Sequence, residues 1–489
     1  MNLLNPSLQS NSRCGKPTLL AVGLLCLTLL TSCTVGPDYE KPVETPPVNY
    51  RYGEAADSSE LVSPEWWLAY SDVRLNELID QAMAQSPTLA AALARVDRAA
   101  ATIGVARSEL FPQVDFFTSA ARDRVSGNTG GFFSSPNSRN EYSTSLGLAW
   151  EIDMWGRVRR LTDAAVAETE AEVDAYAYAL VLLQSNVAEA YFRVLVIDRS
   201  IGILEKTVAG RLELLELAEI RQRSGLGDDL ELAQARTEWA TAVAELEAFR
   251  RERAISENAL AVLTGNFPDN LTITPNLEWE PSIPASPIVV PSDLLERRPD
   301  IAEAERLVAA ASEIIGARIA EYYPRIQING NVGFAASDAS SWFTRNALFG
   351  SLGPSLELPL LTGDLTKSRV EQAKAEYSEI LSLYREQVLE AFRGVEDALA
   401  SLLFLKREIA SQSIAAEAAD TAARLARQRF ESGLVNYLEV IDTERISLTT
   451  NLRLNQIRGE QIAAQLELIR NLGGGWKSDD IGEDESQLR

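Results

Sequence analysis

Four segments of the chain alternate apolar and polar residues with a period of two, which is typical of β-strands whose two faces meet different surroundings. In the clearest segment, Tyr142, Leu146 and Trp150 alternate with small or polar residues. The four segments lie at about 113–123, 141–153, 325–337 and 347–360. Alternation of this length predicts either transmembrane strands or half-buried strands of a soluble sheet.

Two further stretches, about 157–223 and 365–431, contain no proline and are rich in Ala, Leu, Glu and Arg. Each predicts a single helix on the order of 100 Å long, since a helix rises about 1.5 Å per residue. A helix of this length buries one side only in a coiled coil, a helical barrel or an extended bundle. Both stretches are therefore expected to be structural rods.

Short motifs recur in the same order about 208 residues apart, which indicates a tandem repeat. Phe111-Pro112 corresponds to Tyr323-Pro324, and the run 221–226 corresponds to the run 427–434. Each repeat reads as a helix, two strands, a very long helix, a tight turn and another helix. The sequence therefore predicts a mixed α and β protein built from two related halves.

The N-terminus has the form of a secretory signal, with Arg13 and Lys16 ahead of an apolar run that ends at Leu30. The run holds about twelve residues, too few to span a bilayer as a helix. Its ending, Leu30-Thr31-Ser32-Cys33, resembles the lipobox of bacterial lipoproteins. That resemblance implies that Cys33 is modified with lipid. It also implies delivery to the outer membrane, because the next residue is Thr34 and not the Asp that usually retains such lipoproteins in the inner membrane. The alternative is an ordinary secreted protein in which a cysteine occurs at this position by chance.

These signals divide the chain into a signal peptide, an extended Pro-rich tether, two repeats joined by a linker, and an acidic tail expected to be disordered. The expected boundaries are, in that order, 1–32, 33–65, 66–265, 266–290, 291–475 and 476–489.

Composition narrows the function. The 489 residues carry 46 Lys plus Arg and 70 Asp plus Glu, a formal charge of −24, which disfavours nucleic-acid binding. The chain has no histidine, and Cys14 and Cys26 fall inside the expected signal. His-based triads, His metal sites and disulfides are thereby excluded. We expect no catalytic residues, no metal and no cofactor, so the protein is not expected to be an enzyme.

The links between the paired strands, 124–141 and 337–346, are rich in Gly, Ser and Asn, and aromatic residues gather near the strand ends. Those aromatic residues are Phe132, Phe133, Tyr142, Trp150, Trp342, Phe343 and Phe349. Both features favour a transmembrane sheet, because aromatic rings prefer the membrane–water boundary. Four strands cannot close a barrel, and an open edge in lipid leaves costly unpaired backbone groups, so several copies are expected to share one barrel.

Together with the lipobox and the repeats, a few motifs resemble those of the TolC/OprM-type outer-membrane factors, in particular the NodT-like lipoprotein branch. The motifs are the runs 33–39, Trp66-Trp67, Pro291-Ser292-Asp293-Leu294-Leu295-Glu296-Arg297-Arg298-Pro299-Asp300-Ile301 and 433–438. Pro299, within the longest run, suits the first turn of a helix, and Asp300 and the following Glu303 favour the positive N-terminal end of that helix.

The resemblance implies a homotrimer in which each chain gives four strands to a barrel of about twelve strands in outer-membrane lipid, continued by an α-helical barrel in the periplasm. It implies a passive exit duct for drugs, dyes and other small molecules, supplied by an inner-membrane pump of the RND class through a periplasmic adaptor. A duct for type I protein secretion is the alternative within the family. A periplasmic coiled-coil lipoprotein without a pore is the alternative outside it.

Two turns are the expected periplasmic tips, Ser224, Gly225 and Leu226 in the first repeat and Ser432, Gly433 and Leu434 in the second. The first glycine of each turn can end the preceding helix in the left-handed conformation. Asp228 or Asp229 is expected to cap the helix that follows the first turn, and Asn436 the helix that follows the second. A plain helical hairpin explains both turns. The resemblance adds that they contact the adaptor.

Leu438 and Asp442 lie four residues apart and therefore on one helix face. The resemblance implies that they form the constriction of the closed channel, an apolar ring beside an acidic ring that attracts cations. The alternative is that Leu438 packs within the bundle and Asp442 pairs with Arg445. The corresponding first-repeat residues, Leu230 and Gln234, lack the acid.

Overall fold

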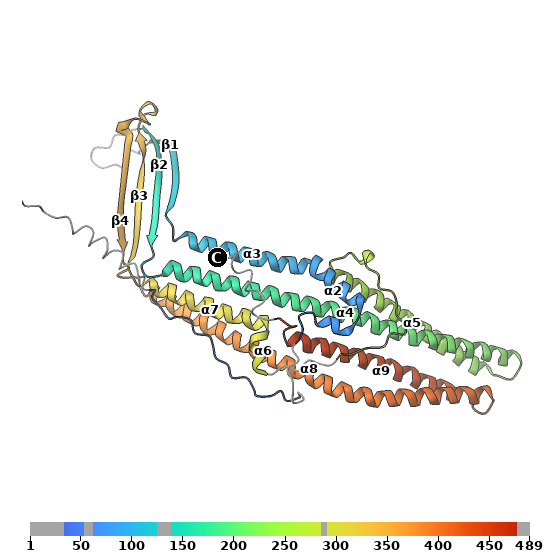
Figure 1. The fold of residues 1–489 in the computed structure, drawn as a ribbon. Coiled ribbons are helices and arrows are strands. Elements are labelled where there is room, and N and C mark those ends of the chain that lie inside the picture. Colours follow the sequence, from blue (N-terminus) through green and yellow to red (C-terminus); the bar gives the residue numbers. More distant parts are fainter. Residues whose placement is uncertain (1–33, 53–61, 125–137, 285–290, 477–489) are drawn as a thin grey trace, which may run out of the picture. The chain divides into compact units, whose positions relative to one another are not determined.

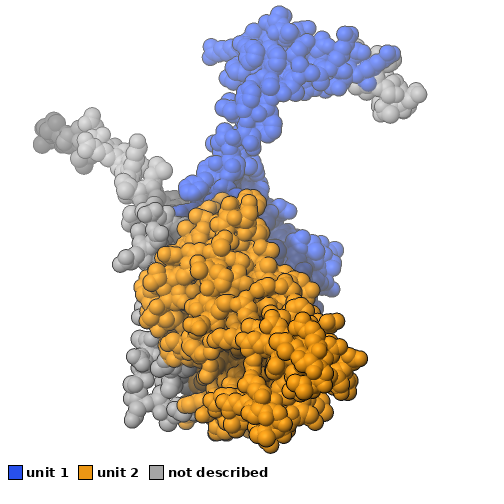
Figure 2. Space-filling view, turned by 90° about the vertical axis from the view of Figure 1, so that its right-hand side faces the viewer, with its two compact units in different colours: residues 1–40, 102–166, 309–378 blue, residues 41–101, 167–308, 379–489 orange. Residues whose placement is uncertain are grey.

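The computed structural model describes residues 34–52, 62–124, 138–284 and 291–476 (Figure 1). The chain divides into two compact units, one built from residues up to 40, 102–166 and 309–378, the other from 41–101, 167–308 and 379–489 (Figure 2). Cys33, Phe132 and Phe133 lie outside the described residues, as do the whole expected signal peptide and the acidic tail after Trp476.

The first unit contains a four-stranded antiparallel sheet in the order β1-β2-β3-β4 (Figure 1). The strands are β1 (Gln113–Arg124), β2 (Ser138–Ile152), β3 (Arg325–Ala336) and β4 (Leu348–Glu357). Each overlaps one of the four segments with alternating polarity. β4 ends three residues before the predicted limit, because Pro359 follows closely and has no N–H to donate to a ladder.

The register of the sheet gathers apolar side chains on one face. Phe116 pairs with Leu146, and Leu146 pairs with Val332, so the three form one row across the sheet. The neighbouring row, Asp115, Gly147, Asn331 and Ser351, lies on the other face. One face of the sheet is therefore apolar across all four strands, and the other is mainly small and polar.

Two very long helices, α4 (Arg157–Arg223) and α8 (Leu365–Glu431), have 67 residues each, and each turns back into a helix of 35 residues, α5 (Asp229–Leu263) or α9 (Tyr437–Asn471). One 18-residue window of α4 is long and apolar enough to cross a membrane, but 61% of it is buried inside the protein. That window is accounted for by packing among helices, and the sheet remains the candidate for membrane contact.

The two hairpin turns have the same hydrogen-bonded geometry. Gly225 and Gly433 adopt φ angles of +71° and +72°, which only glycine tolerates easily. Leu226 N–H donates to the Arg221 carbonyl at 2.8 Å, and Leu434 N–H donates to the Arg429 carbonyl at 2.8 Å. These bonds close a Schellman motif at the end of each long helix.

Side-chain caps start both return helices. Asp228 accepts a hydrogen bond from the N–H of Glu231 at 2.7 Å, and Asn436 accepts one from Glu439 at 3.2 Å. The predicted caps are confirmed, with Asp228 rather than Asp229 as the cap of α5.

The hairpins pack together through two apolar clusters of the second unit, one near the turns and one farther along that contains Ile197, Leu246 and Leu448. The cluster near the turns joins α4, α5, α8 and α9 through Leu214, Ala235, Phe430 and Val440, all almost completely buried. Farther along, Asn455 of α9 donates from Nδ2 to the Val196 carbonyl at 2.8 Å and to Ser200 Oγ at 2.9 Å, both on α4. The two hairpins therefore form one four-helix assembly within this unit.

Shorter helices complete the described chain. They are η1 (Trp66–Tyr70), α2 (Val73–Gln85), α3 (Pro87–Ser108), η2 (Pro268–Asn270), α6 (Pro291–Arg297), α7 (Pro299–Ala320), η3 (Ala339–Ser341) and η4 (Arg345–Ala347). Trp66 and Trp67, which form one of the motifs that carry the resemblance, are both buried and contribute to packing.

The run that begins at Pro291 has a structural role that local sequence reasoning did not predict. The Arg298 guanidinium forms a bidentate pair with Asp300, through Nε to Oδ1 at 3.0 Å and Nη2 to Oδ2 at 2.6 Å, and both residues are buried. Arg298 Nη1 also donates to the Asn471 carbonyl at 2.9 Å, at the end of α9. Gln387 of α8 donates to the same Asp300 carboxylate. The motif thus ties α7 to α8 and α9 within the second unit.

Buried ionic contacts also hold the linker after α5. Asp198 of α4 is completely buried and accepts from Arg253 Nε at 2.5 Å and from the Asn276 N–H at 3.0 Å. Arg253 donates in turn to the Ile273 carbonyl at 2.7 Å, and Glu257 accepts from the Ile273 N–H at 2.6 Å. Asp198 and Arg253 therefore fix the path of the linker against α4 and α5.

Candidate functional site

The sheet of the first unit exposes a continuous apolar face. Phe116, Leu146, Val332 and Leu352 are 65%, 47%, 51% and 74% exposed, although they lie in the middle of their strands. Exposed apolar surface on this scale marks contact with a membrane or another protein.

The opposite face of the sheet carries polar side chains that bond across the strands. Asn329 Nδ2 donates to Ser355 Oγ at 2.9 Å, and Ser351 Oγ donates to Asn331 Oδ1 at 2.7 Å. Phe117 and Phe349 are the aromatic exceptions on this face. A sheet with one apolar and one polar face has the pattern of a transmembrane barrel wall, in which the apolar face meets lipid and the polar face meets water.

Aromatic rings mark both ends of the sheet. At the end with the long connections, Trp342 contacts Tyr142 with a centroid distance of 5.2 Å and stacks on Phe343 at 5.0 Å. At the end next to the helices, Trp155 stacks on Tyr323 at 4.8 Å and donates from Nε1 to the Pro324 carbonyl at 2.8 Å. Rings at both ends match the two interfacial belts of a membrane-spanning element.

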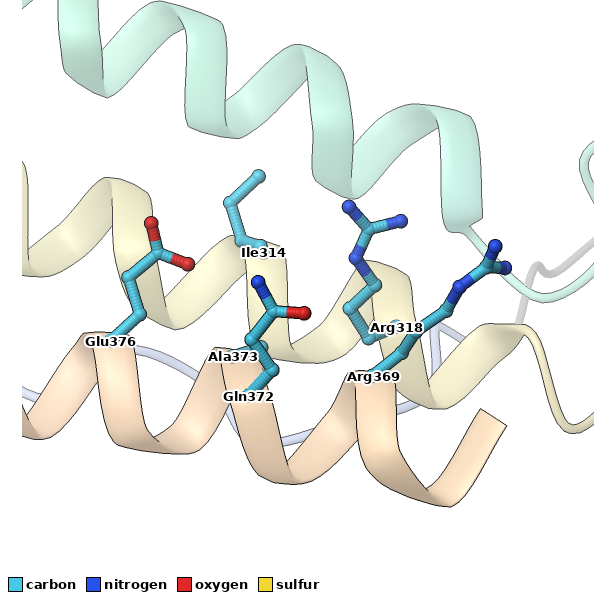
Figure 3. A pocket seen from close by; sticks show the side chains of 6 residues that line it. All are labelled: Ile314, Arg318, Arg369, Gln372, Ala373 and Glu376. Atoms are coloured by element: carbon cyan, nitrogen blue, oxygen red, sulfur yellow. The ribbon is translucent and has the colours of Figure 1, made fainter. Parts of the chain in front are cut away.

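A small cavity of about 220 Å³ lies between α7 and α8 in the same unit, and Figure 3 shows the residues that line it. Arg318 and Arg369 point toward one end of it, and Glu376 lies at the other. Glu321 accepts hydrogen bonds from Arg318 at 2.8 Å and from Arg369 at 2.9 Å. Burial opposes ionisation of the Glu321 carboxyl, but these two hydrogen bonds outweigh it and lower its pKa. The cavity arginines are thus partly neutralised by a shared carboxylate.

The two turns expose apolar side chains at the ends of the hairpins. Leu226 is 74% exposed and Leu434 is 71% exposed, each directly after the glycine of its turn. Ser432 Oγ donates to the Gln428 carbonyl at 2.8 Å, and the Ser224 N–H donates to the Ile220 carbonyl at 3.0 Å. The serines therefore finish their helices, and the leucines present an apolar surface.

The two predicted gate residues lie on one face of α9, one turn apart, and point away from the core. Leu438 is 51% exposed, and Asp442 is exposed. The alternative pairing of Asp442 with Arg445 is not observed, because Arg445 Nη2 lies 3.0 Å from Glu238 Oε1 of α5. Within the described residues Leu438 and Asp442 are therefore free to meet groups outside this chain.

Next to the two predicted gate residues lies an ionic network that sequence reasoning missed. The Glu238 side chain lies between two arginines, 3.2 Å from Arg211 Nη1 and 3.0 Å from Arg445 Nη2. Arg211 is only 5% exposed in its side chain. Nearby, burial raises the pKa of the Glu444 carboxyl, with Glu238 adding to the increase while Arg427 and Arg211 oppose it. The only signal in the sequence for this network is that Arg211, a charged residue, occupies a helical position that faces the core.

A group of acids surrounds Asp174 of α4, which is 8% exposed. Arg306 of α7 lies 3.3 Å from Glu170 and 4.0 Å from Glu305, so the nearest cation is shared between other carboxylates. Burial raises the pKa of the Asp174 carboxyl to about 7; Arg306 opposes this increase, while Glu170, Glu303 and Glu305 add to it. A carboxyl in this position ionises only near neutral pH.

Asp174→Asn is expected to stabilise the protein above pH 7. Because the folded state holds the Asp174 proton more tightly than the unfolded state, the stability it contributes is complete below pH 3.8 and is lost as the pH rises through about 7. The asparagine variant avoids this loss, so its advantage should reach about 2–4 kcal/mol per chain at pH 8 and vanish at pH 4. The unfolding temperature measured between pH 4 and pH 9 checks this.

The exposed Asp80 of α2 provides the matched control for that measurement, since Asp80→Asn makes the same chemical change in solvent. The same pH-dependent gain in both variants, or no gain in Asp174→Asn, would contradict the assignment of a buried acid.

No group of three His, Cys, Asp or Glu side chains able to hold a metal ion occurs within the described ranges. The site is therefore defined by its surfaces: the apolar sheet face, the exposed turns, and the face of α9 that carries Leu438 and Asp442.

A sheet with the pattern of a barrel wall, connected in sequence to two hairpins that each begin with a 67-residue helix, defines an outer-membrane channel protein. Comparison with known proteins identifies the family of channels. A family model for outer membrane efflux proteins matches residues 78–266 and 290–474, and the chain belongs to this family.

Relatives match over nearly the whole chain. The pyoverdine export outer membrane protein OpmQ of Pseudomonas putida is 30% identical over 469 residues, which cover 94% of this chain and 97% of the relative. The cation efflux system protein CusC of Escherichia coli is 28% identical, covering 92% and 98% of the two chains.

Among solved structures, the outer-membrane channel OprN superposes with a TM-score of 0.82 at 28% identity, covering 91% of this chain and all of that one. The channel CmeC of Campylobacter jejuni shares the fold, with a TM-score of 0.85 at 20% identity and coverage of 93% and 98%. The protein is an outer-membrane efflux channel that extends into the periplasm.

Proposed function

We propose that three copies of this chain form a barrel of about twelve strands in the outer membrane, continued by an α-helical barrel in the periplasm. The assembly is a passive exit duct for small molecules such as drugs, dyes and toxic compounds. An inner-membrane pump of the RND class supplies them through a periplasmic adaptor. The duct catalyses no reaction and binds no cofactor.

One observation carries this proposal: the sheet is apolar and exposed on one face and polar on the other across all four strands. β1 and β4 are its edges. In hydrocarbon, each unpaired backbone group at such an edge costs several kcal/mol, so the edges must pair. Pairing β4 of one copy with β1 of the next closes a ring, which places the apolar face in lipid and the polar face around water.

The remaining surfaces fit this arrangement. The exposed leucines of the two turns, Leu226 and Leu434, form the adaptor-contacting tips together with the flanking Ser224, Gly225, Ser432 and Gly433. A lipid on Cys33, attached through the Pro-rich tether, anchors each copy to the membrane. The matching lengths of α4 with α8 and of α5 with α9 support the tandem repeat.

The names of the relatives favour small cargo over secreted protein, since OpmQ is a pyoverdine export protein and CusC belongs to a cation efflux system. We therefore place this chain in a small-molecule efflux system rather than a type I secretion system.

Leu438 and Asp442 form the periplasmic gate. In a trimer, three copies of the exposed α9 face meet around the axis, so the leucines narrow the pore and the carboxylates attract cations. Leu438→Ala combined with Asp442→Ala is expected to raise the single-channel conductance severalfold in planar bilayers and to sensitise cells to large antibiotics.

The matched control is Leu230→Ala combined with Gln234→Ala at the corresponding positions of α5, where no acid is present. This variant should change the conductance much less. An unchanged conductance of the α9 double variant, with its assembly intact, would overturn the gate assignment.

A further inference from the structure

A second, larger cavity of about 1000 Å³ lies between α4, α5 and α9 in the second unit. We call it the inner groove, and its lining residues fall within 189–211, 238–252 and 445–466. Its volume is at the upper end of the range for pockets that hold a drug-sized molecule. Nothing described so far assigns it a ligand.

The inner groove continues the gate face of α9. Helical residues three and four positions apart share a face, and the groove residues Arg445, Thr449, Arg453 and Gln456 follow Asp442 at those steps. If the gate face lines the pore, the groove opens into the pore directly beyond the gate. This part of the inference rests on the proposed function.

The floor of the inner groove is apolar. It is formed by side chains from all three helices: Phe192, Val196, Ile197, Phe249, Leu448, Leu452, Ile462 and Leu466. Such a floor binds the hydrocarbon or aromatic body of a ligand by removing both surfaces from water.

The charges around the floor favour a cation. Each of the four arginines in the lining is already paired with glutamate: Arg193 with Glu252, Arg211 and Arg445 with Glu238, and Arg453 with Glu408 and Glu460. Glu189 and Glu245 also line the groove, and neither forms an ion pair with any residue that the structure describes. The carboxylates of Glu189 and Glu245 therefore leave negative charge in the groove that a positively charged ligand could neutralise.

Each of these two carboxylates shares a helix face with an aromatic ring of the floor. Glu189 precedes Phe192 by three residues on α4, and Glu245 precedes Phe249 by four on α5. A carboxylate beside an aromatic face is the combination that attracts a positively charged nitrogen, through its charge and through the ring quadrupole.

We infer that the inner groove is a binding site for amphipathic organic cations, which rest there on their way through the duct. The apolar floor holds the body of the molecule, and Glu189 or Glu245 holds its charged nitrogen. The site adds selectivity to a channel that otherwise acts as a passive tube.

The test uses the full-length protein purified in detergent and two fluorescent dyes, the cation rhodamine 6G and the anion fluorescein. Saturable binding of rhodamine 6G is expected, without binding of fluorescein. Glu189→Gln combined with Glu245→Gln should weaken rhodamine binding about tenfold or more. Phe249→Leu should weaken it as well, since this change removes a ring but no charge.

The control pair is Glu386→Gln with Glu417→Gln, two exposed acids of α8 that do not line the groove. Equal loss in both pairs would show a general charge effect and overturn the site. No saturable binding of rhodamine 6G by the unmodified protein would also overturn it, because the groove of the assembled protein would then not accept an organic cation.

A bilayer measurement tests the pore-facing placement separately. Rhodamine 6G should reduce the single-channel current of the unmodified protein but not that of the Glu189→Gln, Glu245→Gln pair. Binding without any reduction of current would overturn the placement in the pore. The dye titration measures binding to the groove and does not depend on the gate. If the conductance measurement contradicts the gate assignment of Leu438 and Asp442, the titration still decides whether the groove binds a cation.

Discussion

Arginine in place of Val332 is expected to prevent stable insertion into the outer membrane. Val332 lies in the middle of β3 on the apolar face and is 51% exposed. If that face meets hydrocarbon, a central arginine costs about 2–4 kcal/mol per chain, and the cost recurs in every copy that shares the barrel. The amount of folded protein in outer-membrane fractions, compared with the amount synthesised, measures the effect.

The adjacent residue supplies the control. Asn331 lies on the polar face, where its side chain accepts from Ser351, so Asn331→Arg adds the same charge on the water side of the wall. It is expected to insert almost normally. Normal insertion of Val332→Arg, or equal loss with both variants, would show that the apolar face does not meet lipid.

Replacing Asp198 by alanine is expected to destabilise the second unit by about 3–5 kcal/mol, the range for breaking a buried ion pair by removing one partner. The change leaves Arg253 and the Asn276 N–H without the carboxylate that both contact. The linker then loses a fixed contact with α4. Lower yield of folded protein and faster proteolysis within 266–284 are the expected readouts.

Glu205→Ala is the control, since Glu205 pairs with Arg250 at 2.9 Å on the exposed side of the same two helices. Half-exposed ion pairs contribute at most about 1 kcal/mol, so this variant should fold normally. Similar behaviour of both variants would contradict a special role for the buried pair.

Local signals in the sequence were sufficient to predict the turns and the long helices. A glycine with positive φ followed by an Asp or Asn cap is determined by a few neighbouring residues, and both turns, at Gly225 and Gly433, have the predicted geometry. The helices α4 and α8 span the proline-free stretches from which they were predicted. Alternation likewise located the strands, because a side chain's face follows directly from its position in a strand.

Contacts between distant segments could not be predicted in this way. Asp300 was interpreted as a residue favouring a helix start, but it also holds Arg298, which binds the Asn471 carbonyl 173 residues away. The Arg211–Glu238–Arg445 network joins three helices, and no periodic pattern reveals which charges will meet. The unusual pKa of Asp174 similarly follows only from the folded structure, because it is raised by burial of the side chain and α7 packs beside it.

The proposed gate and the apolar sheet face depend on how copies of the chain meet. Leu438 and Asp442 are exposed in the single chain, and so is the apolar face of the sheet. In the proposed assembly, the α9 face with Leu438 and Asp442 narrows a shared pore, and the apolar sheet face forms the lipid-facing outer surface of a shared barrel. The number of copies is therefore the central claim.

Native mass spectrometry of the mature protein, extracted from outer membranes in detergent, tests that claim most directly. We predict a complex of three chains, each carrying the mass of a lipid on Cys33. A monomer would contradict the proposal, because four strands alone cannot surround a pore, and a periplasmic lipoprotein without a channel would then explain the chain better.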